Sequence, residues 1–209
     1  MNLRRPAVRS SKSAGYSLVE MVVVSGIAVL LFSLAAPSVL DLLKSIRMSH
    51  AASLVQECLT QGQAMATSLN RDVEVRFYRT GGALFSGETS GHGIQLFKIG
   101  EVSNLKEGVV QMLPVGLEER LPVSVQFSLN DAFTSLWKLP AKVGEGQNGI
   151  REYVAFRYRP DGSTDLPEGQ KWSLALVPHP ADVSSSLPAN FAVFMIDPVT
   201  GHISSFRPD

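Results

Sequence analysis

An uncharged apolar run near the N-terminus constrains this chain more than any other feature. Met21 to Leu40 (MVVVSGIAVLLFSLAAPSVL) is twenty residues long and contains no charged side chain. A helix of that length measures about 30 Å, which is the thickness of the hydrocarbon core of a bilayer. A buried helix of a globular core is the alternative, but the basic segment ahead of the run favours a membrane-spanning helix.

The first fifteen residues set the expected orientation. Their only charged residues are Arg4, Arg5, Arg9 and Lys12, which give the segment a charge of +4. Lys and Arg beside a span are retained on the cytoplasmic side. We therefore expect a single-pass inner-membrane protein with a cytoplasmic N-terminus and an exported, periplasmic head after Leu43.

Three kinds of N-terminal signal combine a basic flank with an apolar run. A secretory signal peptide needs small residues at the end of the run, and Ser33 to Ala36 fit, but Pro37 follows and the run is long for such a signal. A lipoprotein signal needs a cysteine there, and the only cysteine is Cys58. The third kind is cut ahead of the run, and the residues at that place favour it.

Those residues, Gly15-Tyr16-Ser17-Leu18-Val19-Glu20, match a family pattern at every position. They resemble the cleavage and methylation signal of type IV pilins and pseudopilins, which is a glycine, an aromatic, Ser/Thr, two aliphatics and a glutamate between a basic leader and an apolar helix. Pro37 also stands where the family often carries a proline, whereas the fifteen-residue leader is longer than many. The resemblance implies that a prepilin peptidase cleaves after Gly15 and methylates the new α-amine of Tyr16. It also implies that Glu20 meets that amine on a neighbouring subunit of a filament.

Each residue of the signal also has a plainer interpretation. Gly15 has no side chain, so it can enter a narrow peptidase cleft or simply form a turn. Glu20 lies at the edge of the apolar run, where an ionisable group usually marks function. It is also the fourth residue of a Ser17-x-x-Glu20 capping box, so it could satisfy the first amides of its own helix. Pro37 removes an amide that would bond to the Ser33 carbonyl, which predicts a kinked or loosened helix.

Beyond Pro37 the apolar residues recur at steps of three and four, as in an amphipathic helix. The pattern predicts one helix from Ser17 to about Asn70, and then changes to the period of two that is typical of strands. We predict strands at 73–78, 94–99, 109–113, 123–127, 153–158, 172–177, 191–196 and 203–206, and a loop at 142–149. The fold class is therefore α+β: one long helix, transmembrane in its first half, packed on a mainly antiparallel β-rich head. The expected divisions are a leader (1–15), a transmembrane and assembly helix (16–43), an amphipathic helix half (44–70) and the head (71–209).

The head shows a second resemblance. Leu54 to Tyr78 is similar to the H-type pseudopilins of type II secretion and the FimT-type minor pilins, in which the long helix leads straight into the first strand. Phe156 to Ser163 is similar to the strand and turn of that group. Val73 to Arg79 and Ile196 to Gly201 resemble the protein D family of a predicted export cassette in Verrucomicrobia.

No catalytic or metal-binding motif stands out. The four histidines (His50, His92, His179 and His202) lie far apart in the sequence, and one cysteine excludes a disulfide framework. Asp161 and Asp165 could share a calcium ion, but a solvated turn is favoured. The pair Glu118-Glu119 is interpreted as a solvated loop, and Cys58 as a small buried residue. A basic stripe could form from Arg71, Arg76, Arg79, Arg151, Arg157 and Arg159, but scattered arginines on strand faces are favoured.

These observations predict a minor pilin or pseudopilin that is not an enzyme and needs no cofactor or metal. Its partners would be the prepilin peptidase, other pilin-like subunits, an inner-membrane assembly platform and membrane lipid. Nucleic acid is not an expected partner, because the chain is neutral with 19 basic and 19 acidic residues. The alternative from another class is a single-pass envelope protein whose β-rich head binds a ligand or is an enzyme.

The first testable prediction concerns leader removal. If the peptidase cleft reads an extended glycine, the side chain in Gly15→Val blocks cleavage, and the uncut precursor stays in the membrane. Mass spectrometry of the N-terminus checks this. A normal Tyr16 terminus in the variant would contradict it.

Overall fold

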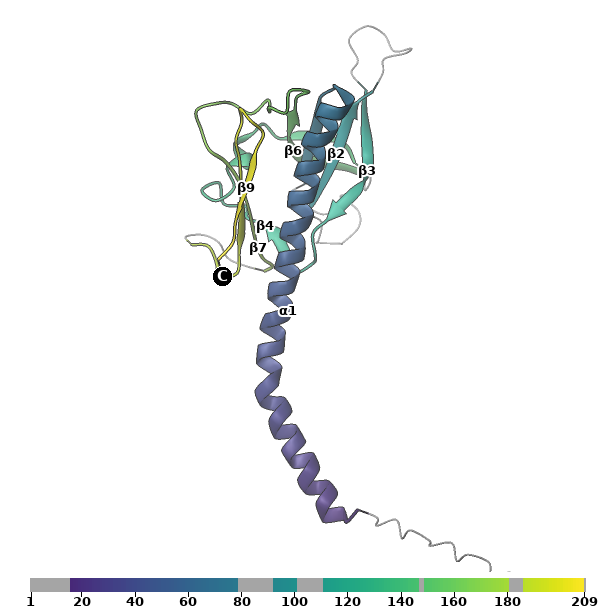
Figure 1. Ribbon diagram of the computed structural model, residues 1–209, viewed down its shortest axis with the longest axis vertical. Helices are drawn as coiled ribbons and strands as arrows, with labels where there is room; N and C mark the ends of the chain where they lie inside the picture. The colour runs from purple at the N-terminus through teal and green to yellow at the C-terminus, as the bar shows by residue number, and fades with distance from the viewer. Residues whose placement is uncertain (1–15, 79–91, 101–110, 147–148, 181–185, 209) are drawn as a thin grey trace, which may run out of the picture. The chain divides into compact units, whose positions relative to one another are not determined.

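The computed structural model describes residues 16–78, 92–100, 111–146, 149–180 and 186–208, of which 34–38, 145, 146 and 149 are described by their backbone alone. Its contacts divide the chain into two units, Met1–Leu42 and Leu43–Asp209. The described residues form an α+β structure: one helix of 52 residues, α1 (Leu18–Leu69), a short 3₁₀ helix and nine strands (Figure 1). All strand pairs among the described residues are antiparallel.

In the first unit, α1 exposes apolar side chains around its whole circumference. Among its described side chains, fourteen large apolar ones are exposed there, at positions 18, 19, 21–24, 27, 29–32, 39, 40 and 42. A helix that is apolar all round is stable only when something other than water covers it. Within the described residues, no helix meets the combined requirement of length and apolarity for crossing a membrane.

In the second unit, the rest of α1 packs along one stripe. Its buried residues are Met48, Ala51, Val55, Cys58, Leu59 and Ala66, which share one core with both sheets. The helix ends because Asn70 adopts φ 51°, a left-handed conformation that Asn tolerates, and the amide of Arg71 donates to the carbonyl of Ala66. The chain therefore turns directly into the first strand, as the change of sequence period predicts.

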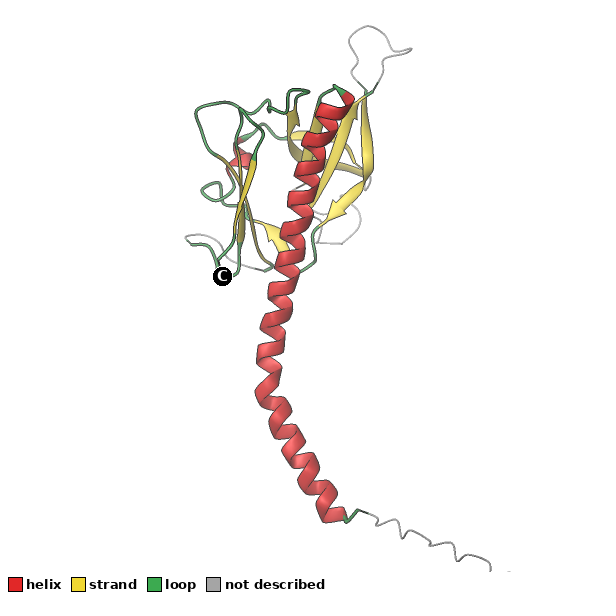
Figure 2. Cartoon of the chain, in the orientation of Figure 1, coloured by secondary structure: helices red, strands yellow, loops and turns green. Residues whose placement is uncertain are grey.

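Two antiparallel sheets complete the head (Figure 2). The first has the order β3-β2-β1-β6-β5, from β1 (Val73–Tyr78), β2 (Gly93–Ile99), β3 (Met112–Arg120), β5 (Lys142–Gly146) and β6 (Gly149–Tyr158). The second has the order β4-β7-β8-β9, from β4 (Val125–Phe127), β7 (Trp172–Pro178), β8 (Ala192–Ile196) and β9 (Ile203–Phe206). The 3₁₀ helix η1 (Ser135–Lys138) bonds to the start of β7 through Ser135 and Ser173.

The predicted helix and the strands at 73–78, 94–99, 153–158, 172–177, 191–196 and 203–206 are confirmed to within a few residues. Two expectations are wrong, and one element was not foreseen. The predicted loop at 142–149 contains β5, which pairs with β6 in an antiparallel arrangement. Gly144 fits in this strand because a Cβ at its position would lie 2.9 Å from the Tyr153 ring. Glu118 and Glu119 lie in β3 and not in a loop, and η1 was not foreseen.

One glutamine fixes the helix to two turns of the head. The side-chain amide of Gln63 donates to the carbonyls of Gly162 (2.9 Å) and Thr200 (3.0 Å), which belong to separate turns. Gly201 has φ 66°, and a Cβ there would lie 2.1 Å from the Gly162 carbonyl oxygen. The two turns that carry the second resemblance therefore meet on one face of α1.

The burial of Met48 and the hydrogen bonds of Arg207 indicate how much of α1 a stable fragment of the head must include. Met48 is fully buried, and the Arg207 guanidinium donates to the Ser45 carbonyl and hydroxyl and to the Ser49 hydroxyl. A fragment of residues 43–209 is therefore expected to be more stable than one of residues 51–209, by about 3 kcal/mol, since it keeps Met48. In thermal unfolding this corresponds to roughly 6–12 °C. Equal melting temperatures would show that the turn before Ala51 is not part of the core.

Candidate functional site

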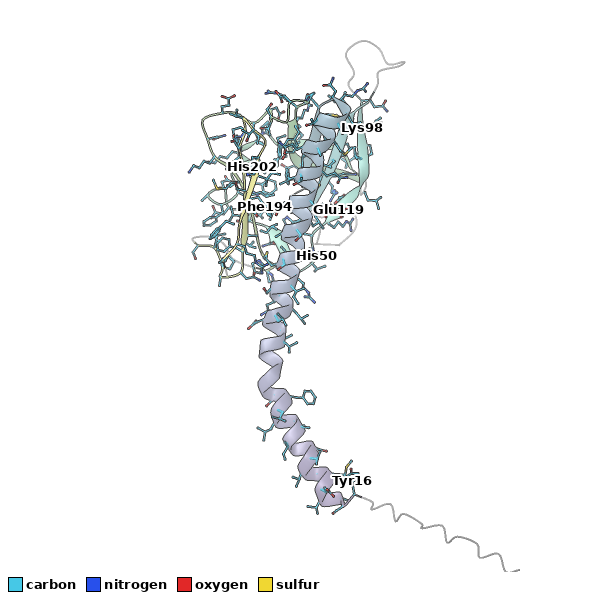
Figure 3. All side chains as sticks on the ribbon, in the orientation of Figure 1. Tyr16, His50, Lys98, Glu119, Phe194 and His202 are labelled. Atoms are coloured by element: carbon cyan, nitrogen blue, oxygen red, sulfur yellow. The ribbon has the colours of Figure 1, made fainter. Side chains whose placement is uncertain are left out.

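The start of α1 holds the residues of the cleavage signal. Gly15 lies outside the described residues. Tyr16 is 79% exposed (Figure 3). Glu20 is exposed in the first turn of the helix. The amide of Met21 donates to the Ser17 carbonyl at 3.1 Å, but in the described part of the chain the side chains of Ser17 and Glu20 make no hydrogen bond. The capping box is thus not formed, and the Glu20 carboxylate remains available to a partner outside the chain.

Pro37 lies within α1, and the helical backbone continues through it. A proline in a helix leaves one carbonyl of the preceding turn without its usual donor. The kink at this position remains a prediction, since the helix is assigned without a break.

The face of the first sheet that is opposite α1 carries a cluster of buried charges. We call the set Glu74, Arg76, Glu118, Arg151 and Arg157 the charged face. Glu74 accepts from Arg76 Nε (2.8 Å) and Arg157 Nε (3.1 Å), and Glu118 accepts from Arg151. Because the side chains of Glu74 and Glu118 are 2% and 1% exposed, these carboxylates depend on their arginines for compensation.

Aromatic rings cover the buried guanidinium groups. Arg76 lies between two rings, 3.7 Å from the Phe97 centroid and 4.4 Å from the Tyr153 centroid. Arg151 lies 4.0 Å from the centroid of Tyr78. Such cation–π contacts are worth about 2 kcal/mol when they are removed from water. Both faces of the central strand β1 are therefore buried, one by apolar contacts with the core and one by paired charges and rings.

The sequence analysis favoured scattered arginines on strand faces, but three of the six lie together. Arg76, Arg151 and Arg157 meet on the charged face, but they are paired with Glu74 and Glu118. Arg159 is exposed in a turn, Arg71 follows the helix end, and Arg79 lies outside the described residues. An arrangement in which carboxylates already bind the arginines stabilises a sheet face and does not offer a cationic surface. Sequence reasoning missed the pairs Glu74–Arg157 and Glu118–Arg151 because their partners come from strands far apart in the chain.

Cys58 is buried, His92 is half-buried and His179 is exposed. Burial is the main reason that the pKa of the Cys58 thiol rises to about 12, with Glu119 and Glu57 adding to it, so the reactive thiolate is scarce at neutral pH. Burial lowers the pKa of His92 to about 4, with a contribution from His179. His92 and His179 are both bonded through their backbones to the turn Leu121–Ser124, so these two histidines are neighbours despite their separation in sequence.

The two aspartates considered as calcium ligands accept hydrogen bonds from nearby residues of the chain. Asp161 accepts from the amide and hydroxyl of Ser163, and Asp165 accepts from the amide of Arg157. The hydrogen bond from the Ser163 hydroxyl is the main cause of the lowered pKa of Asp161. Across the described ranges, no three His, Cys, Asp or Glu side chains come together as a metal site.

The charged face yields a prediction with a matched control. Glu118→Gln removes the charge that compensates the buried Arg151, and the free energy of unfolding should fall by about 3–5 kcal/mol. Glu119→Gln alters the exposed neighbour on the same strand and should change it by less than about 0.5 kcal/mol. Urea unfolding of the 43–209 fragment measures both. Similar small effects of the two substitutions would mean that the Glu118–Arg151 pair contributes little.

Comparison with known proteins does not add a relative. No family model matches the chain, and neither a curated protein nor a solved structure matches it. The α+β fold and its antiparallel sheets are therefore established by the geometry of this chain alone, and any functional proposal rests on its residues.

Proposed function

We propose that this chain is a minor pilin or pseudopilin, a subunit that a prepilin peptidase cleaves and N-methylates before it joins a type II secretion or type IV pilus-like filament. The observation that carries the proposal is the segment Gly15 to Glu20, placed between a leader of charge +4 and a helix of 52 residues. Under this proposal the protein is a substrate of the peptidase and has no catalytic role of its own.

The exposed half of α1 supports the proposal. Its fourteen described, exposed large apolar side chains would each gain about 1.5–3 kcal/mol if they were removed from water, which sums to tens of kcal/mol. Membrane lipid would cover them before assembly, and the helices of neighbouring pilin-like subunits after it. The subunit therefore rests in the inner membrane, with its head in the periplasm, until it is assembled.

Glu20 supports the proposal through its lack of an internal partner. Its side chain is exposed and forms no hydrogen bond within the described residues, although it lies in an apolar segment. In an assembled filament, the methylated amine of Tyr16 from a neighbour would supply the opposite charge. Such a pairing offsets the cost of placing a carboxylate in an apolar environment.

The decisive experiment identifies the N-terminal residue of the mature protein by mass spectrometry. A chain that begins with methylated Tyr16 supports the proposal. A chain that begins at Met1 or after Ala36 contradicts it, and favours a single-pass envelope protein with a ligand-binding or enzymatic head.

Substitution of Glu20 tests the assembly role. If the carboxylate has no partner outside its own chain, Glu20→Gln is mild, because Glu20 forms no capping bond in the subunit and glutamine could make one equally well. If it pairs with the Tyr16 amine of a neighbour, the loss of charge costs about 3–5 kcal/mol per contact. We expect leader cleavage and membrane insertion to survive, and co-purification with neighbouring pilin-like subunits to fall sharply. Unchanged recovery of the complex would remove the assembly role.

A further inference from the structure

Strand β9 forms one edge of the second sheet, and no described segment covers it. In the order β4-β7-β8-β9 it has a neighbouring strand on one side only (Figure 1). Ile203 is half-buried, and Ser204, Ser205 and Phe206 are exposed, although their side chains alternate between the two faces of the sheet. An edge of this kind presents backbone N–H and C=O groups that have no partner within the sheet.

The hydrogen bonding of the turn before β9 shows which backbone groups point outward. The amide of Asp197 donates to the carbonyl of His202 at 3.0 Å, so these two residues form a hydrogen-bonded pair that continues the β8–β9 ladder. In an antiparallel ladder, such pairs alternate with pairs that exchange no hydrogen bond. Ser204 and Phe206 therefore bond to β8, whereas Ile203 and Ser205 direct their N–H and C=O groups away from it.

The other three sheet edges among the described residues are each short or blocked. The edge strand β3 contains Pro114, Gly116 at φ 69° and a register shift against β2. The edge strand β5 carries the charged residues Lys142 and Glu145, and β4 has only three residues. Strand β9 contains neither proline nor a charged residue, and its register with β8 is unbroken. Because natural sheets use such devices to prevent edge pairing, their absence marks β9 as the edge that is open to another strand.

Exposed apolar side chains lie beside this open edge. Val193 and Phe206 are directly opposite each other in the β8–β9 register, and the rings of Phe191 and Phe206 have centroids 6.0 Å apart. Phe206 is 60% exposed and Met195 is 41% exposed, and neither β8 nor β9 contains a charged residue. A strand added beside β9 would therefore match this surface best with an apolar side chain opposite Phe206.

A positive charge lies at the C-terminal end of the open edge. Arg207 directly follows β9, and within the described residues its guanidinium contacts only neutral groups, which belong to Ser45, Ser49 and Asn190. Its position two residues after Ser205 places it on the same face of an extended strand. A carboxylate on the added strand opposite Arg207 would therefore complement a charge that this chain leaves uncompensated.

We propose that the open edge of β9 binds an extended segment of another protein, which adds an antiparallel strand to the second sheet. The segment carries an acidic residue opposite Arg207, followed by an apolar residue opposite Phe206. The antiparallel direction continues that of the sheet, and it is slightly more stable per residue than a parallel one. This surface lies on the head, goes beyond the helix contacts of the proposed function and does not depend on removal of the leader.

A second copy of β9 does not suit this edge. Gln63 of α1 donates to the carbonyl of Thr200, which precedes β9, and Arg207, which follows β9, bonds to Ser45 of α1. Strand β9 therefore runs antiparallel to α1, and two copies of β9 in an antiparallel pair would place their helices in opposite directions. Under the proposed function both helices enter one membrane from the same side, which such a pair does not allow.

Binding of a designed peptide to the full chain in detergent tests the edge. The probe is the fluorescent peptide Gly-Glu-Val-Thr-Val-Thr-Gly, in which the glutamate and the first valine would lie opposite Arg207 and Phe206. Ser205→Pro removes an outward amide and should weaken binding by about ten-fold, whereas Ser205→Ala keeps the amide and should bind like the unsubstituted chain. Fluorescence polarisation measures both. Absence of binding to the unsubstituted chain, or equal binding by Ser205→Pro, overturns the proposal.

Thermal unfolding of the same variants checks the direction of the amides. Ser205→Pro should change the melting temperature little, because an outward amide has no partner in the sheet. Ser204→Pro removes an amide that bonds to β8 and should lower the melting temperature by roughly 6–12 °C. If the two substitutions destabilise the chain equally, the Ser205 amide does not point outward and the proposal fails.

A change of charge on both sides tests the Arg207 contact. The unsubstituted chain should bind the probe about three-fold more tightly than the same peptide with Gln in place of Glu. In Arg207→Gln this preference should vanish, a result that a purely structural role of Arg207 would not produce. The probe sequence in reverse, whose glutamate reaches Arg207 only in a parallel strand, should bind no better than the Gln peptide. A preference that persists in Arg207→Gln, or tighter binding of the reversed peptide, overturns the proposed arrangement.

Two further outcomes separate this inference from its alternatives. Disulfide-linked dimers of Ser205→Cys in membranes after mild oxidation would show that a second copy occupies the edge, and they would overturn the choice of partner. A methylated Tyr16 terminus without peptide binding rejects this inference alone, whereas peptide binding by a chain with an unprocessed N-terminus rejects only the proposed function.

Discussion

The burial of one helical stripe against both sheets is the interaction on which the rest of the structure depends. Met48, Val55 and Leu59 of α1 are fully buried in a core shared with both sheets. Removing any one of them would leave a cavity between the helix and a sheet, at a typical cost of several kcal/mol. The head is therefore not a separate domain tethered to a helix, because the helix supplies one wall of its core.

Because α1 covers one face of the first sheet, the other face of that sheet is buried without the helix. The central strand β1 is buried on both faces, which normally calls for a continuous apolar sequence. Here the sequence alternates, and the polar set is tolerated because each buried carboxylate has an arginine and each buried guanidinium has an aromatic ring. Such a face specifies strand register closely, since a shift of one residue would place Glu74 and Arg76 in the apolar core.

The sequence predicted what depends on local periodicity and missed what depends on distant pairing. The helix, its end near Asn70 and most strands follow from the change of period, and they are found within a few residues. The hairpin of β5 was missed because glycines at 144 and 146 indicate a loop unless a neighbouring ring, here Tyr153, requires the space. Glu118 was placed in a loop because its partner Arg151 is 33 residues away in sequence. The interpretation of Gly15, Tyr16 and Glu20 as a cleavage signal stays a prediction, and it could be made from the sequence because a peptidase would read a linear segment.

The charges of α1 are few and unevenly placed. Between Leu18 and Leu69 the charged residues are Glu20, Asp41, Lys44, Arg47 and Glu57. A solvated helix of this length normally carries many charges, arranged as pairs three or four residues apart. Here the acids at the two ends, Glu20 and Glu57, have no basic residue at that spacing, and the basic residues lie between them at 44 and 47. On α1 itself, both carboxylates therefore lack a basic residue at the pairing distance. Under the proposed function, the methylated amine of Tyr16 from a neighbouring subunit would meet Glu20, so the sparse charges of this helix would suit contacts between subunits better than the stability of one subunit.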